Sequence, residues 1–135
     1  YSGNSLPNSP NYKLSATVEW YFDFGSLGIV IPRYDLAWTD DIFFDPSNGI
    51  GVAPNREGGF GKLPKLSLGQ PAYALHNIRL SYRNADSTAE VSLWGRNLTD
   101  QRYKNYAFDA TSFKNVILNF AGEPRSFGID FALNF

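Results

Sequence analysis

The sequence contains no cysteine, and this absence excludes several classes of protein at once. A disulfide scaffold, a cysteine-ligated zinc site and thiol catalysis all require that residue. An excess of charge of either sign is also missing, because 12 Lys and Arg residues stand against 13 Asp and Glu residues. Surfaces that bind nucleic acids are strongly basic, so the composition does not favour a nucleic acid as a partner.

Long apolar runs and methionine are absent as well. A membrane-spanning helix needs about 18 or more uncharged apolar residues. The longest stretch between charges, from Leu66 to Ile78, is interrupted by Gly69, Pro71 and His76. The sequence therefore predicts no transmembrane helix. Its first residues also lack the charged and apolar regions of a signal peptide, so we expect the chain to be a piece of a longer protein.

Aromatic residues are abundant, at 16% of the chain, yet the mean hydropathy is only −0.30 because polar residues separate them. The apolar residues recur with a period of two, which is the spacing of a β-strand with one apolar face. The first such run is Leu14, Ala16, Val18, Trp20, Phe22 and Phe24. Similar runs predict strands over 12–24, 27–44, 73–83, 88–98 and 125–135. The fold class is thus all-β, an antiparallel meander of about five long strands.

The connections between these strands alternate in length. Short turns are predicted at Gly25–Ser26 and at 84–87, whereas the stretches 46–70 and 101–123 are long. Outer-membrane β-barrels show this asymmetry, with short turns on one side and long loops on the other. Residues 116–120 resemble a strand, and we interpret them as loop structure or as an extension of the last strand. Pro32 cannot donate to a sheet, so it is expected near a strand end or bulge.

A soluble β-sandwich, such as a carbohydrate-binding module, is the alternative fold. The alternating runs of about 10 to 13 residues exceed typical sandwich strands and suit a tilted crossing of a bilayer. We therefore predict that the large apolar side chains share one outward face. The members of this predicted face are Leu14, Val18, Trp20, Leu36, Trp38, Val91, Phe127 and Phe131. Burial of these residues between two layers would instead indicate a sandwich.

Four segments, in order along the chain, resemble TonB-dependent outer-membrane receptors. The first is G-x-x-L-P-N-x-P at residues 3–10, and the second is YALHNIRLSY at residues 73–82. The third is the N-L-T/F-D-x-x-Y signature, carried by Asn97, Leu98, Asp100 and Tyr103. The fourth is the closing segment 123–135, which ends in phenylalanine.

This resemblance implies that residues 1–135 form a single partial domain, the last strands of a barrel of about 22 strands, without the plug domain and the TonB box. It implies a place in the outer membrane of a Gram-negative bacterium and import of a scarce ligand such as a ferric siderophore, with no enzymatic activity and no cofactor. The implied partners are outer-membrane lipid, the rest of the barrel and the plug, the TonB complex and the barrel-assembly machinery. Phe131, Leu133 and Phe135 resemble the assembly signal. Another outer-membrane barrel family remains an alternative.

The long connections carry the candidate ligand-binding residues. Arg56, Lys62 and Lys65 give the first one a basic character that suits an anionic ligand or the phosphates of the outer leaflet. Tyr106 and Phe108 in the second could stack on a ligand or pack the loop down. Both connections could equally be ordinary solvated loops.

No catalytic or metal site is predicted. His76, the only histidine, lies on the apolar side of a predicted strand, which gives a Ser-His-Asp arrangement no support. An oxygen-rich cluster of Asp40, Asp41, Asp45 and Asn48 could bind calcium. Its spacing matches no EF-hand, and turn chemistry explains these residues without an ion.

Overall fold

The computed structural model of the chain describes residues 2–46, 48, 52–54, 60–62, 66–110 and 117–134. These residues are arranged in antiparallel β-structure, which confirms the predicted fold class. No helix in these ranges is long and apolar enough to cross a membrane. The chain divides into two compact units, which we call the sheet unit (14–38, 74–101 and 123–135) and the hairpin unit (1–13, 39–73 and 102–122).

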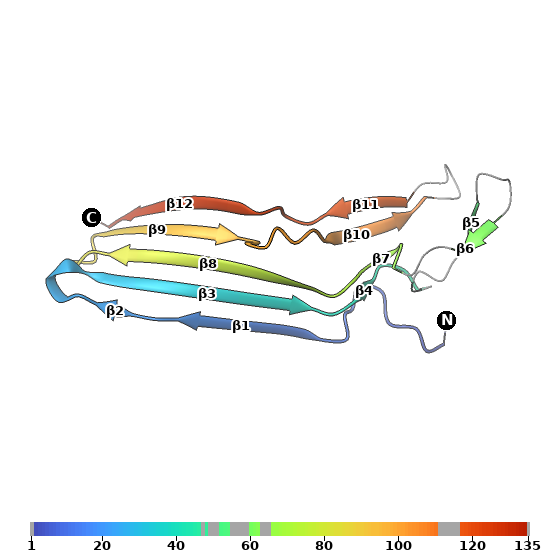
Figure 1. Ribbon diagram of the computed structural model, residues 1–135, viewed down its shortest axis with the longest axis horizontal. Helices are drawn as coiled ribbons and strands as arrows, with labels where there is room; N and C mark the ends of the chain where they lie inside the picture. The colour runs from blue at the N-terminus through green and yellow to red at the C-terminus, as the bar shows by residue number, and fades with distance from the viewer. Residues whose placement is uncertain are drawn as a thin grey trace. The chain divides into compact units, whose positions relative to one another are not determined.

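The sheet unit is one antiparallel meander in which each strand lies beside its neighbour in the sequence (Figure 1). Its strands, in spatial order, are β1 (Lys13–Glu19), β3 (Ile29–Thr39), β8 (Tyr73–Arg83), β9 (Ala89–Arg96) and β12 (Ser126–Leu133). The short strand β2 (Phe22–Asp23) pairs with the start of β3. All five predicted strands are present, with β1 and β12 at the two edges of the sheet.

The register of β8, β9 and β12 separates apolar from polar side chains. Leu80 lies opposite Leu93, which lies opposite Ile129. One position along, Ser81 lies opposite Ser92, which lies opposite Asp130. Because successive side chains of a strand point to opposite faces, the first set belongs to an apolar face and the second to a polar face. These names are kept below for the two faces of the sheet unit.

In the part of the chain that the structure describes, no second layer covers the apolar face. Phe131 is 77% exposed and Phe127 is 67% exposed, both on the edge strand β12. Trp20, which follows the opposite edge strand β1, is 54% exposed. Among the large apolar residues in the described part of the sheet unit, Ile31 alone is buried. Leu14 and Val18 are exposed, whereas Leu36, Trp38 and Val91 are half-buried. A sandwich would bury this face, so the sandwich alternative does not describe the chain.

The two predicted short turns are present at one end of the sheet. A single 3₁₀ turn, Gly25–Leu27, leads into β3, and Asp23 accepts a hydrogen bond from the backbone of Gly25 at 2.8 Å. Gly28 follows at φ 101°, where a Cβ atom would lie 2.2 Å from the carbonyl oxygen of Arg83. A larger residue would therefore push the two neighbouring turns apart.

The sequence predicts Pro32 near a strand end or a bulge, and Pro32 lies inside β3, beside the gap between β1 and β2. Its carbonyl oxygen accepts a hydrogen bond from the backbone of Trp20 at 3.0 Å. Trp20 lies in the gap between β1 and β2. The irregularity that accommodates the proline is thus in the neighbouring strand.

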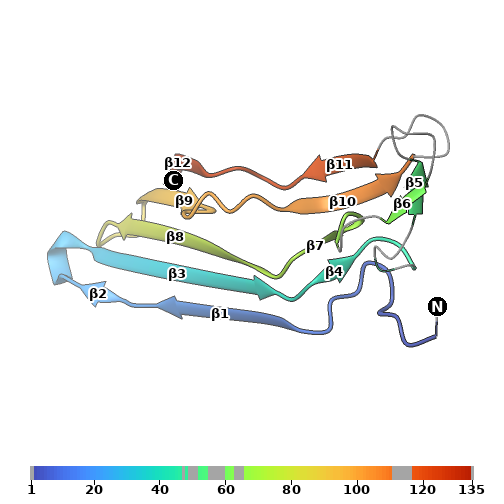
Figure 2. The ribbon, with the colours of Figure 1, turned by 45° about the vertical axis from the view of Figure 1, so that its right-hand side comes forward.

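Among its described residues, the hairpin unit contains three short antiparallel pairs (Figure 2). These are β4 (Ile42–Phe43) with β7 (Gly69–Gln70), β5 (Val52–Pro54) with β6 (Phe60–Lys62), and β10 (Lys104–Asp109) with β11 (Ile117–Ala121). Phe44, Leu68 and Ala107 form a small buried cluster against Ile42 and Ile117. The predicted long connections therefore carry hairpins of their own. Residues 117–121 are a strand paired with β10, so the segment interpreted as loop structure is one arm of a hairpin within the long connection.

Candidate functional site

The basic ligand candidates fall in the part of the chain that the structure describes least. Arg56 and Lys65 lie outside the described residues. Lys62 is the last residue of β6, where its backbone pairs with Val52. Their predicted role in binding an anionic ligand stays a prediction.

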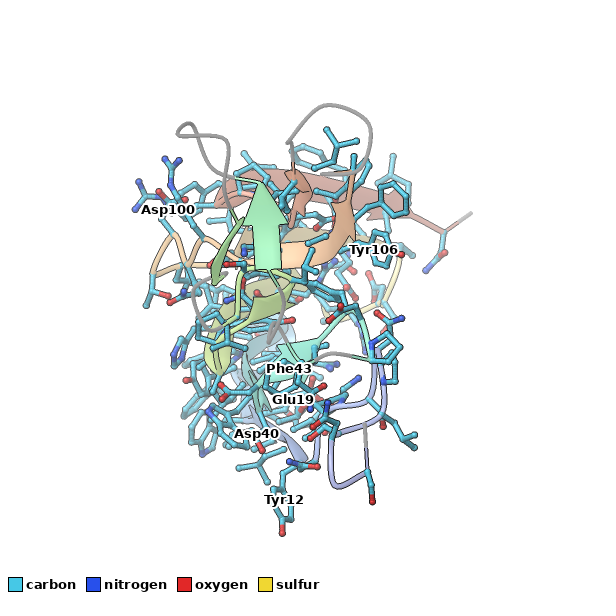
Figure 3. The ribbon with its side chains drawn as sticks, turned by 90° about the vertical axis from the view of Figure 1, so that its right-hand side faces the viewer. Tyr12, Glu19, Asp40, Phe43, Asp100 and Tyr106 are labelled. Carbon is cyan, nitrogen blue, oxygen red and sulfur yellow. The ribbon has the colours of Figure 1, made fainter. Side chains whose placement is uncertain are left out.

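Tyr106 and Phe108 lie on β10 and share one face of the β10–β11 hairpin (Tyr106 is labelled in Figure 3). The register places Tyr106 opposite Phe120 and Phe108 opposite Leu118. The ring centroid of Tyr106 lies 5.6 Å from that of Phe44 and 6.3 Å from that of Phe120. All four hairpin side chains remain substantially exposed. The four residues thus form an exposed apolar surface, and Tyr106 connects it to Phe44 through their ring contact.

A second aromatic pair in the hairpin unit was not singled out from the sequence. The rings of Tyr73 and Tyr103 stack with centroids 4.6 Å apart and planes 14° apart. A Cβ atom on Gly122 would lie 2.1 Å from the Tyr103 ring, so the ring fits there only because residue 122 has no side chain. Tyr103 belongs to the N-L-T-D-x-x-Y signature, and this signal could have located the pair. Beside it, Arg102 and Lys104 line a hollow of about 260 Å³.

The polar face of the sheet unit carries an ordered series of ion pairs. Arg33 binds Asp35 on its own strand, with a shortest separation of 3.0 Å, and lies 3.9 Å from Glu19. Arg79 pairs with Asp130 across β9 at 3.0 Å, and Arg83 pairs with Glu90 at 2.9 Å. These side chains are partly exposed, so each pair contributes little to stability by itself. Together they keep charged groups on one side of the sheet.

Trp94 is the centre of a network on the polar face. Its indole lies across Gly128, where a Cβ atom would approach the ring to 2.2 Å. The indole nitrogen donates a hydrogen bond to Asp130 at 3.2 Å, and the guanidinium carbon of Arg96 lies 5.0 Å from the ring centroid. Glycine opposite Trp94 therefore lets the ring lie flat and support the arginine.

Two polar groups sit on the apolar side of the strands. The Tyr34 hydroxyl and Nδ1 of His76 form a hydrogen bond of 2.6 Å between β3 and β8. This pairing gives the two polar atoms a partner in apolar surroundings. It also gives His76 a structural role.

The oxygen-rich cluster considered for calcium is used in turn contacts. An oxygen of Asp41 accepts a hydrogen bond from the backbone of Ala72 at 2.7 Å, and the carbonyl oxygen of Asp45 accepts one from Asn48 at 3.3 Å. In the described ranges, no group of three or more His, Cys, Asp or Glu side chains is placed to hold a metal ion.

Comparison with known proteins gives one match in three dimensions. The ferric yersiniabactin uptake receptor FyuA from Yersinia pestis superposes on 98% of this chain with a TM-score of 0.76 and 22% sequence identity. The chain has the fold of part of that receptor. It spans 17% of the receptor's length. No protein-family model matches the chain, and no curated protein matches it in sequence.

Proposed function

We propose that the chain is part of the barrel wall of a TonB-dependent outer-membrane receptor that imports a scarce ligand such as a ferric siderophore. The observation that carries this proposal is the antiparallel sheet with one exposed apolar face and one ion-paired polar face. The fold shared with an uptake receptor and the sequence motifs support the same assignment. In this arrangement the apolar face contacts outer-membrane lipid and the polar face lines the barrel interior.

The edges of the sheet indicate where the rest of the barrel attaches. In the strand order of the sheet unit, β1 and β12 each have one neighbouring strand. An unpaired edge of this length invites association with other strands, and closure into a barrel removes it. The remaining strands and the plug are therefore the partners we propose, together with the TonB complex that supplies energy. Arg56, Lys62, Lys65, Tyr106 and Phe108 remain the proposed ligand contacts on the loops.

Arginine in place of Ile129 tests the assignment of the apolar face. Ile129 lies between exposed apolar neighbours and would face hydrocarbon, where an arginine costs about 2 to 4 kcal/mol near the bilayer centre. We expect Ile129→Arg to reduce the heat-modifiable receptor in outer membranes several-fold. The control is Ala132→Arg, on the same strand but on the polar face. Equal losses in both variants would contradict a lipid-facing role.

Uptake by iron-starved cells tests the proposed transport. Deletion of the gene that encodes the intact protein should abolish accumulation of a ferric siderophore labelled with radioactive iron. Accumulation should return when the protein is expressed in cells with TonB and should stay absent in cells without it. Cobalamin uptake, measured in parallel, reports on the other ligand class that this kind of receptor could serve. Uptake of both ligands that is unchanged by the deletion would overturn the proposal.

A further inference from the structure

A hollow of about 440 Å³ lies on the polar face of the sheet unit. Its polar and aromatic lining consists of Arg33, Asp35, Asn77, Arg79, Trp94 and Arg96. Three arginines against one aspartate make this lining positive. The question is which of the arginines is free to bind something outside the sheet.

Two of the three arginines are already neutralised. Arg33 is bound to Asp35, and Arg79 is bound to Asp130. Arg96 differs, because no carboxylate in the described part of the chain pairs with it. Its guanidinium lies over the Trp94 ring, with the central carbon 5.0 Å from the ring centroid. This cation–π contact holds the guanidinium over the ring and engages none of its N–H groups with an oxygen acceptor, so they are available to one.

A second donor lies beside Arg96. Ile78 and Gly95 are paired between β8 and β9, and Asn77 and Arg96 are the next residues beyond that pair. The side-chain oxygen of Asn77 accepts a hydrogen bond from the backbone of Asn97 at 2.9 Å, and this contact fixes the amide. Its NH₂ group has no partner in the described residues. The hollow thus contains a positioned guanidinium and a positioned amide donor side by side.

We infer that Arg96 and Asn77 form a carboxylate-binding site on the polar face. A guanidinium binds a carboxylate through two parallel hydrogen bonds, and the Asn77 amide supplies a third donor. The one guanidinium without a carboxylate partner binds one carboxylate group at a time, so a polycarboxylate such as citrate binds through one of its groups. The carboxylate belongs either to a small solute or to a side chain elsewhere in the intact protein. The inference rests on the proposed function only for the route by which a solute reaches this face.

Fluorine NMR of the intact protein in detergent micelles tests the site, with citrate as the carboxylate probe. The protein is labelled with 5-fluorotryptophan, and the Trp94 resonance is assigned with Trp94→Phe. Citrate should move this resonance saturably in the unsubstituted protein. Affinity should fall roughly tenfold or more in Arg96→Gln and less in Asn77→Ala. Arg83→Gln, which removes an arginine paired with Glu90 on the same face, should bind citrate unchanged.

A side chain of the protein that already occupies the site gives a different result. Citrate then leaves the Trp94 resonance unchanged, and Arg96→Gln lowers the urea midpoint at pH 7. This difference from the unsubstituted protein should vanish at about pH 2.5, where carboxyl groups are protonated. Loss of the stack on Trp94 alone would lower the midpoint at both pH values, because arginine stays charged.

Two results overturn the inference. One is a citrate-induced shift that persists in Arg96→Gln. The other is no shift in the unsubstituted protein together with a midpoint difference that is absent or independent of pH. Both readouts are independent of the uptake assay, so failure of the site and failure of the proposed transport can be told apart.

Discussion

Replacing Asn97 by alanine is expected to destabilise the sheet unit by about 2 to 4 kcal/mol. Asn97 is 4% exposed and connects the end of β9 to the segment before β12. Its amide nitrogen donates to the carbonyl oxygens of Gln101 and Glu123, at 2.9 and 3.0 Å, and its oxygen accepts from the backbone of Gln101 at 2.8 Å. Alanine would remove all three of these hydrogen bonds, which involve a buried side chain. The measurement is the urea midpoint of the detergent-folded protein.

The backbone of Asn97 adds a second cost to this substitution. Its φ of 50° lies in the left-handed region, which asparagine tolerates better than alanine. Asn97→Gly relieves that strain but still lacks the amide, so it should recover only part of the loss. Asn105→Ala is the matched control, because Asn105 is exposed on β10 and should change stability by no more than about 0.5 kcal/mol. Equal midpoints for Asn97→Ala and this control would refute a stabilising role for the hydrogen bonds of the Asn97 side chain.

The long strands could be predicted because each one carries its own signal. In β12 the apolar residues Phe127, Ile129 and Phe131 alternate with polar or small ones, and the register of the sheet preserves that alternation. A slip of one residue would move all of them to the polar face, so the pattern fixes both the strand and its pairing. The exposed apolar face followed from the same reasoning.

The hairpin unit could not be predicted in the same way, because its strands are too short to show a period. β4 and β7 are two residues long, and they pair across a stretch that separates Phe43 from Gly69. β10 contains Tyr106 and Phe108 at alternate positions, but its pairing with β11 decides that it is a strand. Pairing over such distances depends on contacts that the local sequence does not encode.

The polar contacts of the candidate sites also depend on register. Asn97 belongs to a motif found in the sequence, yet its contact with Glu123 exists only because β9 and β12 are neighbours. Likewise, the sequence identifies Arg96 only as a polar residue of a strand. Its contact with the Trp94 ring depends on Gly128 of the neighbouring strand, which leaves room for that ring. Sequence patterns locate such residues on a face, but the partners that give them a role come from the neighbouring strands.

If the chain is part of the proposed barrel, deletion of Phe135 is expected to remove most of the heat-modifiable, folded form of the intact protein from the outer membrane. The closing segment alternates large apolar residues up to its aromatic last residue, which resembles the signal that the barrel-assembly machinery recognises. Phe135 lies outside the described residues, but Phe131 and Leu133 are 77% and 65% exposed on β12. Their side chains are therefore accessible to a protein that binds this strand. The measurement is the amount of folded protein in outer-membrane fractions of cells that produce the intact protein.

Asn134→Ala is the matched control for this deletion. The Asn134 side chain donates one exposed hydrogen bond to the carbonyl oxygen of Ser87 at 3.3 Å, while its backbone bond to Thr88 does not depend on the side chain. Its replacement should therefore leave the amount of folded protein almost unchanged. Deletion of one terminal side chain would cost an independently folding domain no more than about 1 kcal/mol, so a large loss specific to the deletion indicates recognition during assembly rather than lost packing. Equal outer-membrane levels for both variants would exclude Phe135 as part of an assembly signal and leave the assignment of the barrel wall intact.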